Sequence, residues 1–327
     1  MQTQTNYQTL CSLALLLSIV IGCKQSSSTD VIPPDPTCQA QTVNAVSVES
    51  GTTFTTGTAF NYDGKGQLTS AVTSNSGTSG AGGRTTQTYT YDNDGYQTAY
   101  KSVYAYTGQG DETYNYTYEY ANGRLTKQTT QSTSDYVEST GTATYTYDAA
   151  GVLTQSLGAY NFKFGKITSA TSYTTSFANG VLTAEKSIVD GKATTTTYTV
   201  ENGRITTETR SDGTKTRYTY DAGGYQTKSE ALNTGGIVTS STTTEYGTTQ
   251  APKSLYPAQK GRPVNKPYYG NNDRAVTRVT TTSNGKLFSD YQYQYQLNSK
   301  GYPTKLVRTN VLTNTLQTTT YAYVNCQ

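Results

Sequence analysis

A ten-residue pattern that recurs along the chain constrains the fold more than any other feature. Each copy reads aromatic, any residue, Tyr, Asp, two residues, Gly, any residue, Leu or a similar residue, and Thr. Full or nearly full copies begin at Phe60, Tyr89, Tyr145, Tyr218 and Tyr295, and a shorter Asn-Gly form begins at Tyr118, Phe177 and Tyr198. From Gly66 to Gly224, consecutive repeat glycines are 21 to 29 residues apart. This spacing indicates one supersecondary unit per repeat.

Each position of the repeat has a physical role in a β-hairpin. The two aromatic rings project from one face of a strand, because side chains alternate with period two. Asp bonds its own backbone to open a turn, and Gly supplies the positive φ that closes it. The shorter Asn-Gly form suits a two-residue type I′ turn. The predicted turn glycines are Gly66, Gly95, Gly123, Gly151, Gly180, Gly203, Gly224 and Gly301.

The composition agrees with an all-β chain. Among 327 residues there are 31 Tyr and 66 Thr, and both types are poor helix formers that fit a pleated surface. Further turn signals between the repeats, such as Asp190-Gly191 and Asp212-Gly213, give every strand a turn at both ends. Nine tandem hairpins, one of them degenerate, predict an antiparallel meander of roughly 16 to 20 strands. We expect it to form a twisted or curled open sheet, or a partial barrel-like shell.

The repeat resembles the YD repeat of RHS-type proteins, and the resemblance covers about residues 54–323. In that family the hairpins wind into a hollow β-shell that encloses a toxin. That role is not carried over, because this chain is far shorter and lacks both the Pro-rich autoproteolytic segment and a C-terminal toxin domain. With the N-terminal features described next, the arrangement is similar to uncharacterised envelope lipoproteins of Bacteroidetes.

Residues 1–22 are predicted to be a lipoprotein signal peptide. The apolar run from Leu10 to Ile21 is too short to span a bilayer but fits a signal-peptide core. The following Gly22-Cys23 completes a segment that resembles the bacterial lipobox. The resemblance implies cleavage before Cys23 and acylation of this residue, for example by palmitate, which anchors the protein to a membrane. An ordinary secretory signal with an incidental Cys is the alternative.

The rest of the chain divides into a tether and one domain. Residues 23–37 are polar and contain prolines, and we interpret them as a spacer between the lipid and a single domain at residues 38–327. Lys24 does not resemble a retention signal, which favours the outer over the inner membrane; the periplasmic and the surface-exposed sides both stay open. Four prolines preclude a central strand within residues 247–275, where we expect an irregular, ordered crossing loop.

Two cysteines, Cys38 and Cys326, are left for the folded domain once Cys11 leaves with the signal and Cys23 carries lipid. They lie at opposite ends of the domain in an exported protein, where the surroundings are oxidising. We predict a disulfide bond between them. Two free thiols are the alternative.

Several function classes are disfavoured by composition. The chain has no His, which excludes Ser-His-Asp and Cys-His nucleophile pairs and imidazole ligands for zinc. Carboxylates lie mostly at turns, and no spacing suggests a glycosidase pair or a calcium site. No Lys/Arg cluster accompanies the net charge of +3. We therefore predict no enzyme activity, no cofactor or metal and no nucleic-acid partner; the oligomeric state is open.

The tyrosine rows are the candidate binding surface. They contain Tyr89, Tyr91, Tyr116, Tyr118, Tyr145, Tyr147, Tyr218, Tyr220 and Tyr293. In one interpretation these rings pack a thin sheet and keep their hydroxyls in water at its edge. In the other they form an aromatic platform for a glycan or a protein partner. We expect an envelope lipoprotein that acts as a binding or interaction module; a structural scaffold is the alternative, and a carbohydrate-active enzyme is disfavoured.

Overall fold

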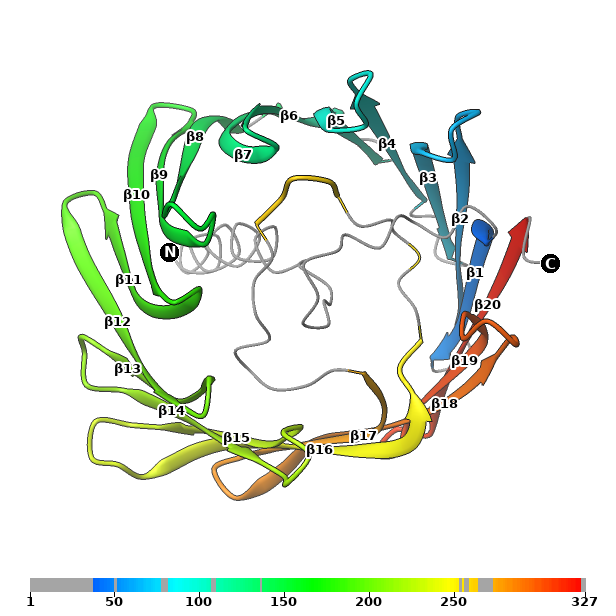
Figure 1. Cartoon of the computed structure of the whole chain (residues 1–327). Helices are drawn as coiled ribbons and strands as arrows, with labels where there is room; N and C mark the ends of the chain where they lie inside the picture. The colour runs from blue at the N-terminus through cyan, green and yellow to red at the C-terminus, as the bar shows by residue number, and fades with distance from the viewer. Residues whose placement is uncertain are drawn as a thin grey trace.

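The computed structural model describes residues 38–49, 52–77, 82–106, 110–135, 137–252, 255, 259–263 and 273–324. Twenty β-strands joined by turns make up the secondary structure of this part of the chain (Figure 1). The strands are β1 Gln39–Glu49, β2 Thr52–Tyr62, β3 Leu68–Gly77, β4 Gly83–Tyr91, β5 Gln97–Tyr106, β6 Glu112–Ala121, β7 Arg124–Thr133, β8 Val137–Tyr147, β9 Leu153–Phe164, β10 Ile167–Ala178, β11 Val181–Val189, β12 Lys192–Glu201, β13 Arg204–Arg210, β14 Lys215–Tyr220, β15 Gln226–Leu232, β16 Val238–Gln250, β17 Arg274–Ser283, β18 Lys286–Leu297, β19 Pro303–Asn310 and β20 Thr315–Val324.

The strands form one closed barrel. Each strand pairs antiparallel with its neighbours in the sequence, and β1 pairs antiparallel with β20, from Gln39 opposite Val324 to Val48 opposite Leu316. The predicted all-β antiparallel meander is therefore confirmed. The predicted open or partly closed sheet is corrected, because the β1–β20 pairing closes it (Figure 1). Closure gives the backbone of every strand two partners and leaves no unpaired edge.

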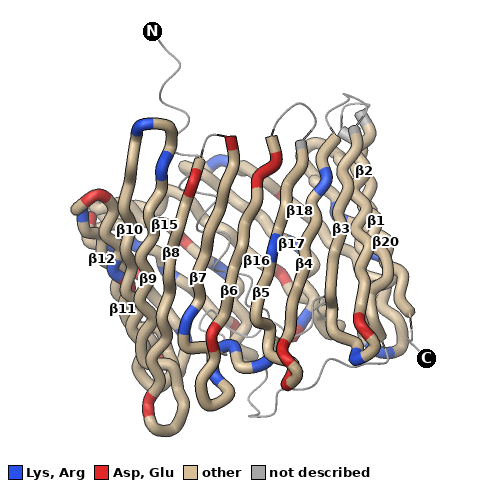
Figure 2. Tube along the Cα trace, turned by 90° about the horizontal axis from the view of Figure 1, so that it is seen from above, with Lys and Arg blue, Asp and Glu red and all other residues tan. Residues whose placement is uncertain are grey.

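The barrel has two rims that differ in their turns. Turns within the repeats connect even-numbered strands to the next odd-numbered ones, except that residues 251–273 join β16 to β17. We call this end of the barrel the repeat rim. Turns between the repeats lie at the opposite end, the linker rim; Figure 2 shows the strands running between the two ends. Strand β1 begins at the repeat rim and β20 ends there, so both chain ends of the barrel lie at this rim.

Some predictions fall wholly or partly outside the described residues. The signal peptide, the lipidated Cys23, the tether and Cys326 lie there. Cys38 is described, buried and disulfide-bonded, while its pairing with Cys326 stays a prediction. The expected loop at 247–275 is shorter in the structure, since β16 continues to Gln250 and β17 begins at Arg274. We call residues 251–273 the crossing segment.

The repeat turns follow from local backbone chemistry. In the first full copy, the Asp63 carboxylate accepts backbone N–H groups of Lys65 and Gln67 at 2.8 and 2.9 Å. All eight predicted turn glycines have a positive φ, for example 78° at Gly66. In the short form Asn202 and Gly203 have φ values of 51° and 74°, as a type I′ turn requires.

The threonine that ends each repeat supports a β-bulge. The register of the β2–β3 pair shifts beside the turn, so that Thr69 is an extra residue in β3. Its hydroxyl donates to the carbonyl oxygen of Asn61 at 3.1 Å, and Thr154 bonds Thr146 in the same way at 3.0 Å. Equivalent bonds are made by Thr98, Thr126, Thr183, Thr227 and Thr304. The threonine hydroxyl thus supplies a hydrogen bond to a carbonyl that the bulge takes out of the strand ladder.

The small hydrophobic core lies in a belt near the repeat rim. The Leu positions of the repeats are its main members, with Leu68, Leu125 and Ile205 almost completely buried. One cluster joins Leu68 to Phe60 and two alanines, and a second joins Ile205 to Leu182. The repeat therefore encodes a hairpin together with its contribution to this belt.

Candidate binding surface in the barrel interior

The tyrosine rows face the barrel interior. On β6 the rings of Tyr116 and Tyr118 are half-buried, whereas Thr117 and Glu119 on the alternate positions are exposed. The Arg262 guanidinium of the crossing segment lies 3.7 Å from the centre of the Tyr118 ring. Figure 1 shows the described parts of this segment inside the ring of strands. The face that carries Tyr118 is therefore the inner one, and the threonine face points outward.

Neighbouring strands align their tyrosines into ladders on the inner wall. The ring centres of Tyr89 and Tyr100 are 5.2 Å apart, and those of Tyr100 and Tyr116 are 5.5 Å apart. Tyr160 and Tyr173 stack at 5.8 Å. These separations suit tilted and offset aromatic pairs. The predicted residues Tyr89 and Tyr116 thus belong to one continuous aromatic surface, which also contains Tyr100.

Two glycines on the inner face make room for this surface. A Cβ atom on Gly141 would lie 2.0 Å from a ring carbon of Tyr160, and one on Gly158 would lie 2.1 Å from a ring carbon of Tyr173. Each ring therefore lies flat against the backbone of the neighbouring strand. Glycine within a strand marks such a close approach.

Six inward-facing tyrosines have a structural role instead. Four stand at the second aromatic position of a repeat, and the other two, Tyr246 and Tyr323, lie on β16 and β20. In each case the hydroxyl donates to a backbone carbonyl at the start of the preceding hairpin's return strand, rather than pointing into water at a sheet edge. These bonds join Tyr91 to Leu68 at 3.0 Å, Tyr120 to Gln97 at 3.0 Å, Tyr147 to Leu125 at 2.8 Å, Tyr220 to Ile205 at 2.5 Å, Tyr246 to Gln226 at 3.0 Å and Tyr323 to Pro303 at 2.6 Å. We call them tyrosine latches. Of the predicted surface residues, Tyr91, Tyr147 and Tyr220 are therefore latches that hold hairpins together, and they are not among the ladder residues.

The latches predict a loss of stability at high pH. Burial, as the largest cause, raises the pKa of Tyr91, Tyr147 and Tyr220 to about 12, and for Tyr91 the charge of Asp63 adds to it. Because these phenols ionise more readily in the unfolded chain, with a pKa of about 10, their stabilisation is complete below that value. It is lost as the pH rises from about 10 through 12. Tyrosinate absorbance and far-UV circular dichroism, recorded during one alkaline titration, should change together. Full ionisation near pH 10 of a barrel that stays folded would contradict this expectation.

The inner wall formed by β11 to β14 is chemically different. Tyr198 donates to the Glu185 carboxylate at 2.5 Å, and Tyr218 donates to the Glu208 carboxylate at 2.8 Å. Burial and the partner carboxylates raise the pKa of both phenols. Within the described residues no group of three or more His, Cys, Asp and Glu is placed to hold a metal. Of the predicted surface residues, Tyr218 thus lies in a carboxylate–phenol region.

Basic residues of the crossing segment bind it to the opposite wall. The Lys260 ammonium donates to the carbonyl oxygen of Asp94 at 2.8 Å and lies 4.3 Å from the centre of the Tyr96 ring. The carbonyl oxygen of Gly261 accepts the Leu125 N–H at 2.8 Å. Together with the Arg262–Tyr118 contact, these bonds bring the segment from β16 to the turns of β4–β7. The sequence predicted a crossing loop but not its anchors.

The number of strands sets the width of the barrel. Twenty strands spaced about 4.8 Å apart and tilted by about 40° enclose a barrel about 40 Å across. Inward side chains narrow this width. The tyrosine ladders on β4–β10 lie on the inner face of this ring of strands.

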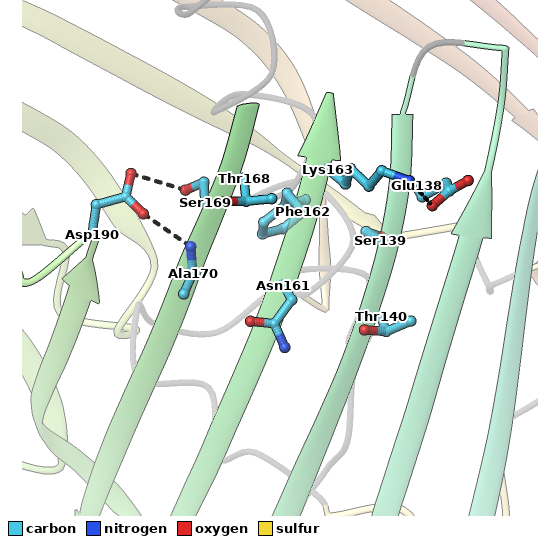
Figure 3. Close-up of a pocket in the computed structure, with 10 residues that line it drawn as sticks. All are labelled: Glu138, Ser139, Thr140, Asn161, Phe162, Lys163, Thr168, Ser169, Ala170 and Asp190. Atoms are coloured by element: carbon cyan, nitrogen blue, oxygen red, sulfur yellow. Dashed lines mark hydrogen bonds and ion pairs between the residues drawn. The ribbon is translucent and has the colours of Figure 1, made fainter. Parts of the chain in front are cut away.

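The outer wall carries charge but no comparable surface. All six ion pairs among the described residues lie on its face, for example Lys127–Glu119 at 2.7 Å and Arg278–Asp290 at 2.7 Å. A hollow of about 440 Å³ at the linker rim is lined by residues of β8–β10 and Asp190 (Figure 3). There the Asp190 carboxylate already accepts bonds from Ser169 and Ala170. This hollow offers no unsatisfied charged group for a ligand.

Comparisons with known proteins show similarity of architecture only. No family model matches the sequence, and no curated protein matches it. A porin-like protein from Bacteroides uniformis superposes with a TM-score of 0.35 at 15% identity, over 87% of this chain and 97% of that one. A porin-like protein from Bacteroides vulgatus superposes with a TM-score of 0.33 at 11% identity, over 87% of this chain and 99% of that one. The toxin chain TcdB2-TccC3 superposes with a TM-score of 0.21 at 12% identity, over 79% of this chain and 16% of that one. Superpositions this loose do not assign the chain to a family. In the described residues, no helix has the length and hydropathy to cross a bilayer.

Proposed function

We propose that this protein is a non-catalytic, lipid-anchored component of the bacterial cell envelope whose barrel interior binds a neutral glycan segment. The Tyr89–Tyr100–Tyr116 ladder on the inner wall is the observation that carries the proposal. Sugar rings expose apolar C–H faces, which stack on aromatic rings, and their hydroxyl groups need nearby amides and hydroxyls. Gln87 and Thr130 supply such groups beside the ladder.

The charge distribution favours a neutral ligand. Between β4 and β8 the described inner wall carries Tyr, Thr, Ser and Gln, and its one carboxylate, Glu112, accepts the Tyr114 hydroxyl at 2.5 Å near the linker rim. A pocket that combines apolar faces with a few polar groups is typical of small-molecule and oligosaccharide sites. Apart from the Arg262 guanidinium, which lies on the Tyr118 ring, a charged ligand would lack a counter-charge along this ladder.

The outer face supports a barrel that stands in water. Membrane-spanning barrels carry an apolar band on the outside, whereas this outer face carries ion pairs and rows of threonine. Acyl chains on Cys23 would then hold the protein at the membrane, as the lipobox resemblance implies. Two or more chains give stable anchoring.

A glycan array on the purified protein tests the proposal. We expect binding to neutral polysaccharides, and a loss of at least tenfold in affinity for Tyr100→Ala and Tyr116→Ala because each removes a stacking face. The matched controls are Lys101→Ala and Thr117→Ala, which change the adjacent, outward-facing positions and should bind as the wild type does. Absence of glycan binding, with ladder tyrosines protected from surface labelling, would favour the scaffold alternative. Binding of a peptide instead would also overturn the proposal.

A further inference from the structure

Exposed large hydrophobic side chains gather at one end of the barrel. Thirteen of the fourteen found in the described residues lie in, or within five residues of, turns at the linker rim, and the exception is Leu157 on the outer wall. The thirteen are Val46, Val48, Phe54, Phe164, Ile167, Val189, Ile237, Val238, Leu287, Phe288, Val311, Leu312 and Leu316. The repeat rim, in contrast, buries its hydrophobic residues in the core belt. An asymmetry of this kind marks an interaction surface.

The most exposed of these side chains come from three separate turns. Ile167 at the β9–β10 turn is 68% exposed, Ile237 at the β15–β16 turn 67%, and Phe288 beside the β17–β18 turn 73%. Because the barrel is closed, turns at one end share one annulus (Figure 2). Such an annulus fits a flat partner better than a narrow one.

Charged neighbours indicate the chemistry of that partner. Lys166 precedes Ile167, Lys286 precedes Leu287 and Phe288, and both lysines are exposed. The Asp190 carboxylate accepts hydrogen bonds from Ser169 and Ala170, and Glu138 pairs with Lys163. Further carboxylates of the rim, Asp111, Glu112, Asp135 and Asp212, lie at the β5–β6, β7–β8 and β13–β14 connections, which carry none of the thirteen exposed hydrophobic side chains. Aliphatic and Phe side chains beside lysines are typical of surfaces that enter the headgroup region of anionic bilayers. Protein interfaces are enriched in aromatic residues, Met and Arg but depleted in Lys.

We propose that the linker rim rests on a lipid bilayer that contains anionic lipids, with Ile167, Ile237 and Phe288 inserted at the headgroup boundary. The tether permits this orientation. Cys38 lies at the repeat rim, and the 14 residues of 24–37 reach at most about 50 Å. A ten-residue strand rises only about 33 Å along its axis. A lipid on Cys23 therefore reaches the bilayer beside the barrel.

Vesicle flotation of an unacylated chain tests the proposal without the lipid anchor. All twenty strands lie between Gln39 and Val324, so a chain that begins at residue 23 and carries Cys23→Ser contains the whole barrel. We expect it to float with phosphatidylcholine vesicles that contain phosphatidylglycerol. The double variant Ile167→Ser/Phe288→Ser should lower the partition constant about a hundredfold, on the order of tenfold per inserted side chain. The matched control Leu157→Ser removes an exposed leucine from the outer wall and should float as the parent does.

Charge reversal provides a second readout that leaves the apolar residues in place. Lys166→Glu/Lys286→Glu should weaken binding to anionic vesicles by at least about tenfold, and should leave binding to pure phosphatidylcholine unchanged. Equal flotation of parent and Ser variant, or no flotation of the parent, would overturn the proposal. A third result would also overturn it: the parent forms a dimer in light scattering, the Ser variant does not, and the parent does not float with vesicles. The rim would then bind a second copy of the chain.

Discussion

Ile205→Ala is expected to lower the free energy of unfolding by about 3 kcal/mol, within the range for large-to-small changes in cores. The side chain is fully buried, at 0% exposure, and packs with Leu182, Val200 and Tyr218. Its own carbonyl also accepts the Tyr220 latch. The buried belt of this barrel is thin, so few neighbouring side chains can move into the space that truncation leaves.

Urea denaturation followed by far-UV circular dichroism measures this effect. Leu157→Ala is the control, because it removes a similar side chain from an exposed position on the outer wall. We expect that change to cost no more than about 0.5 kcal/mol. Equal destabilisation by the two variants would show that the belt is not the main source of stability.

The hairpins were predictable from the sequence because their causes are local. Asp63 bonds the backbone within four residues, and Gly66 adopts its positive φ within the same turn. The Asn202-Gly203 turn is equally local. Closure has no such signal. It depends on the pairing of β1 with β20, whose residues lie more than 260 positions apart, and on twist accumulated over many bulges.

The candidate surface was predictable only in part. Alternation placed Tyr116 and Tyr118 on one face of a strand, but nothing in that pattern states whether the face points inward. The pattern gives Tyr89 and Tyr91 different positions in the repeat, but it does not state that the first ring joins a ladder while the second hydroxyl bonds a carbonyl of another hairpin. The anchor Arg262 bonds across the barrel to a ring 144 positions earlier, which no local rule identifies.

Breaking the predicted Cys38–Cys326 disulfide is expected to have the largest effect on stability. By the chain-entropy argument, closing a loop of nearly the whole domain contributes about 5 kcal/mol. Cys38 is buried, disulfide-bonded and followed by Gln39, which pairs with Val324. That pairing brings the two chain ends together where the meander closes. A Cys38–Cys326 bond would therefore reinforce a closure that otherwise depends on one strand pair and its neighbours.

Urea denaturation of Cys326→Ser, compared with the wild type with and without reductant, measures this contribution. The variant and the reduced wild type should unfold at the same lower urea concentration. Two alkylatable thiols in the unreduced mature protein would contradict the prediction.

The place where the barrel first opens shows whether the disulfide stabilises the β1–β20 closure or the barrel as a whole. Without the disulfide, strand separation should begin between β1 and β20, because both strands end at the repeat rim where the bond is expected. Amide hydrogen exchange at the paired Ala45 and Thr319 should then accelerate before exchange at Thr171 and Tyr160 of the β9–β10 pair. Uniform acceleration would show instead that the barrel opens as a single cooperative unit, with no preferred line of opening.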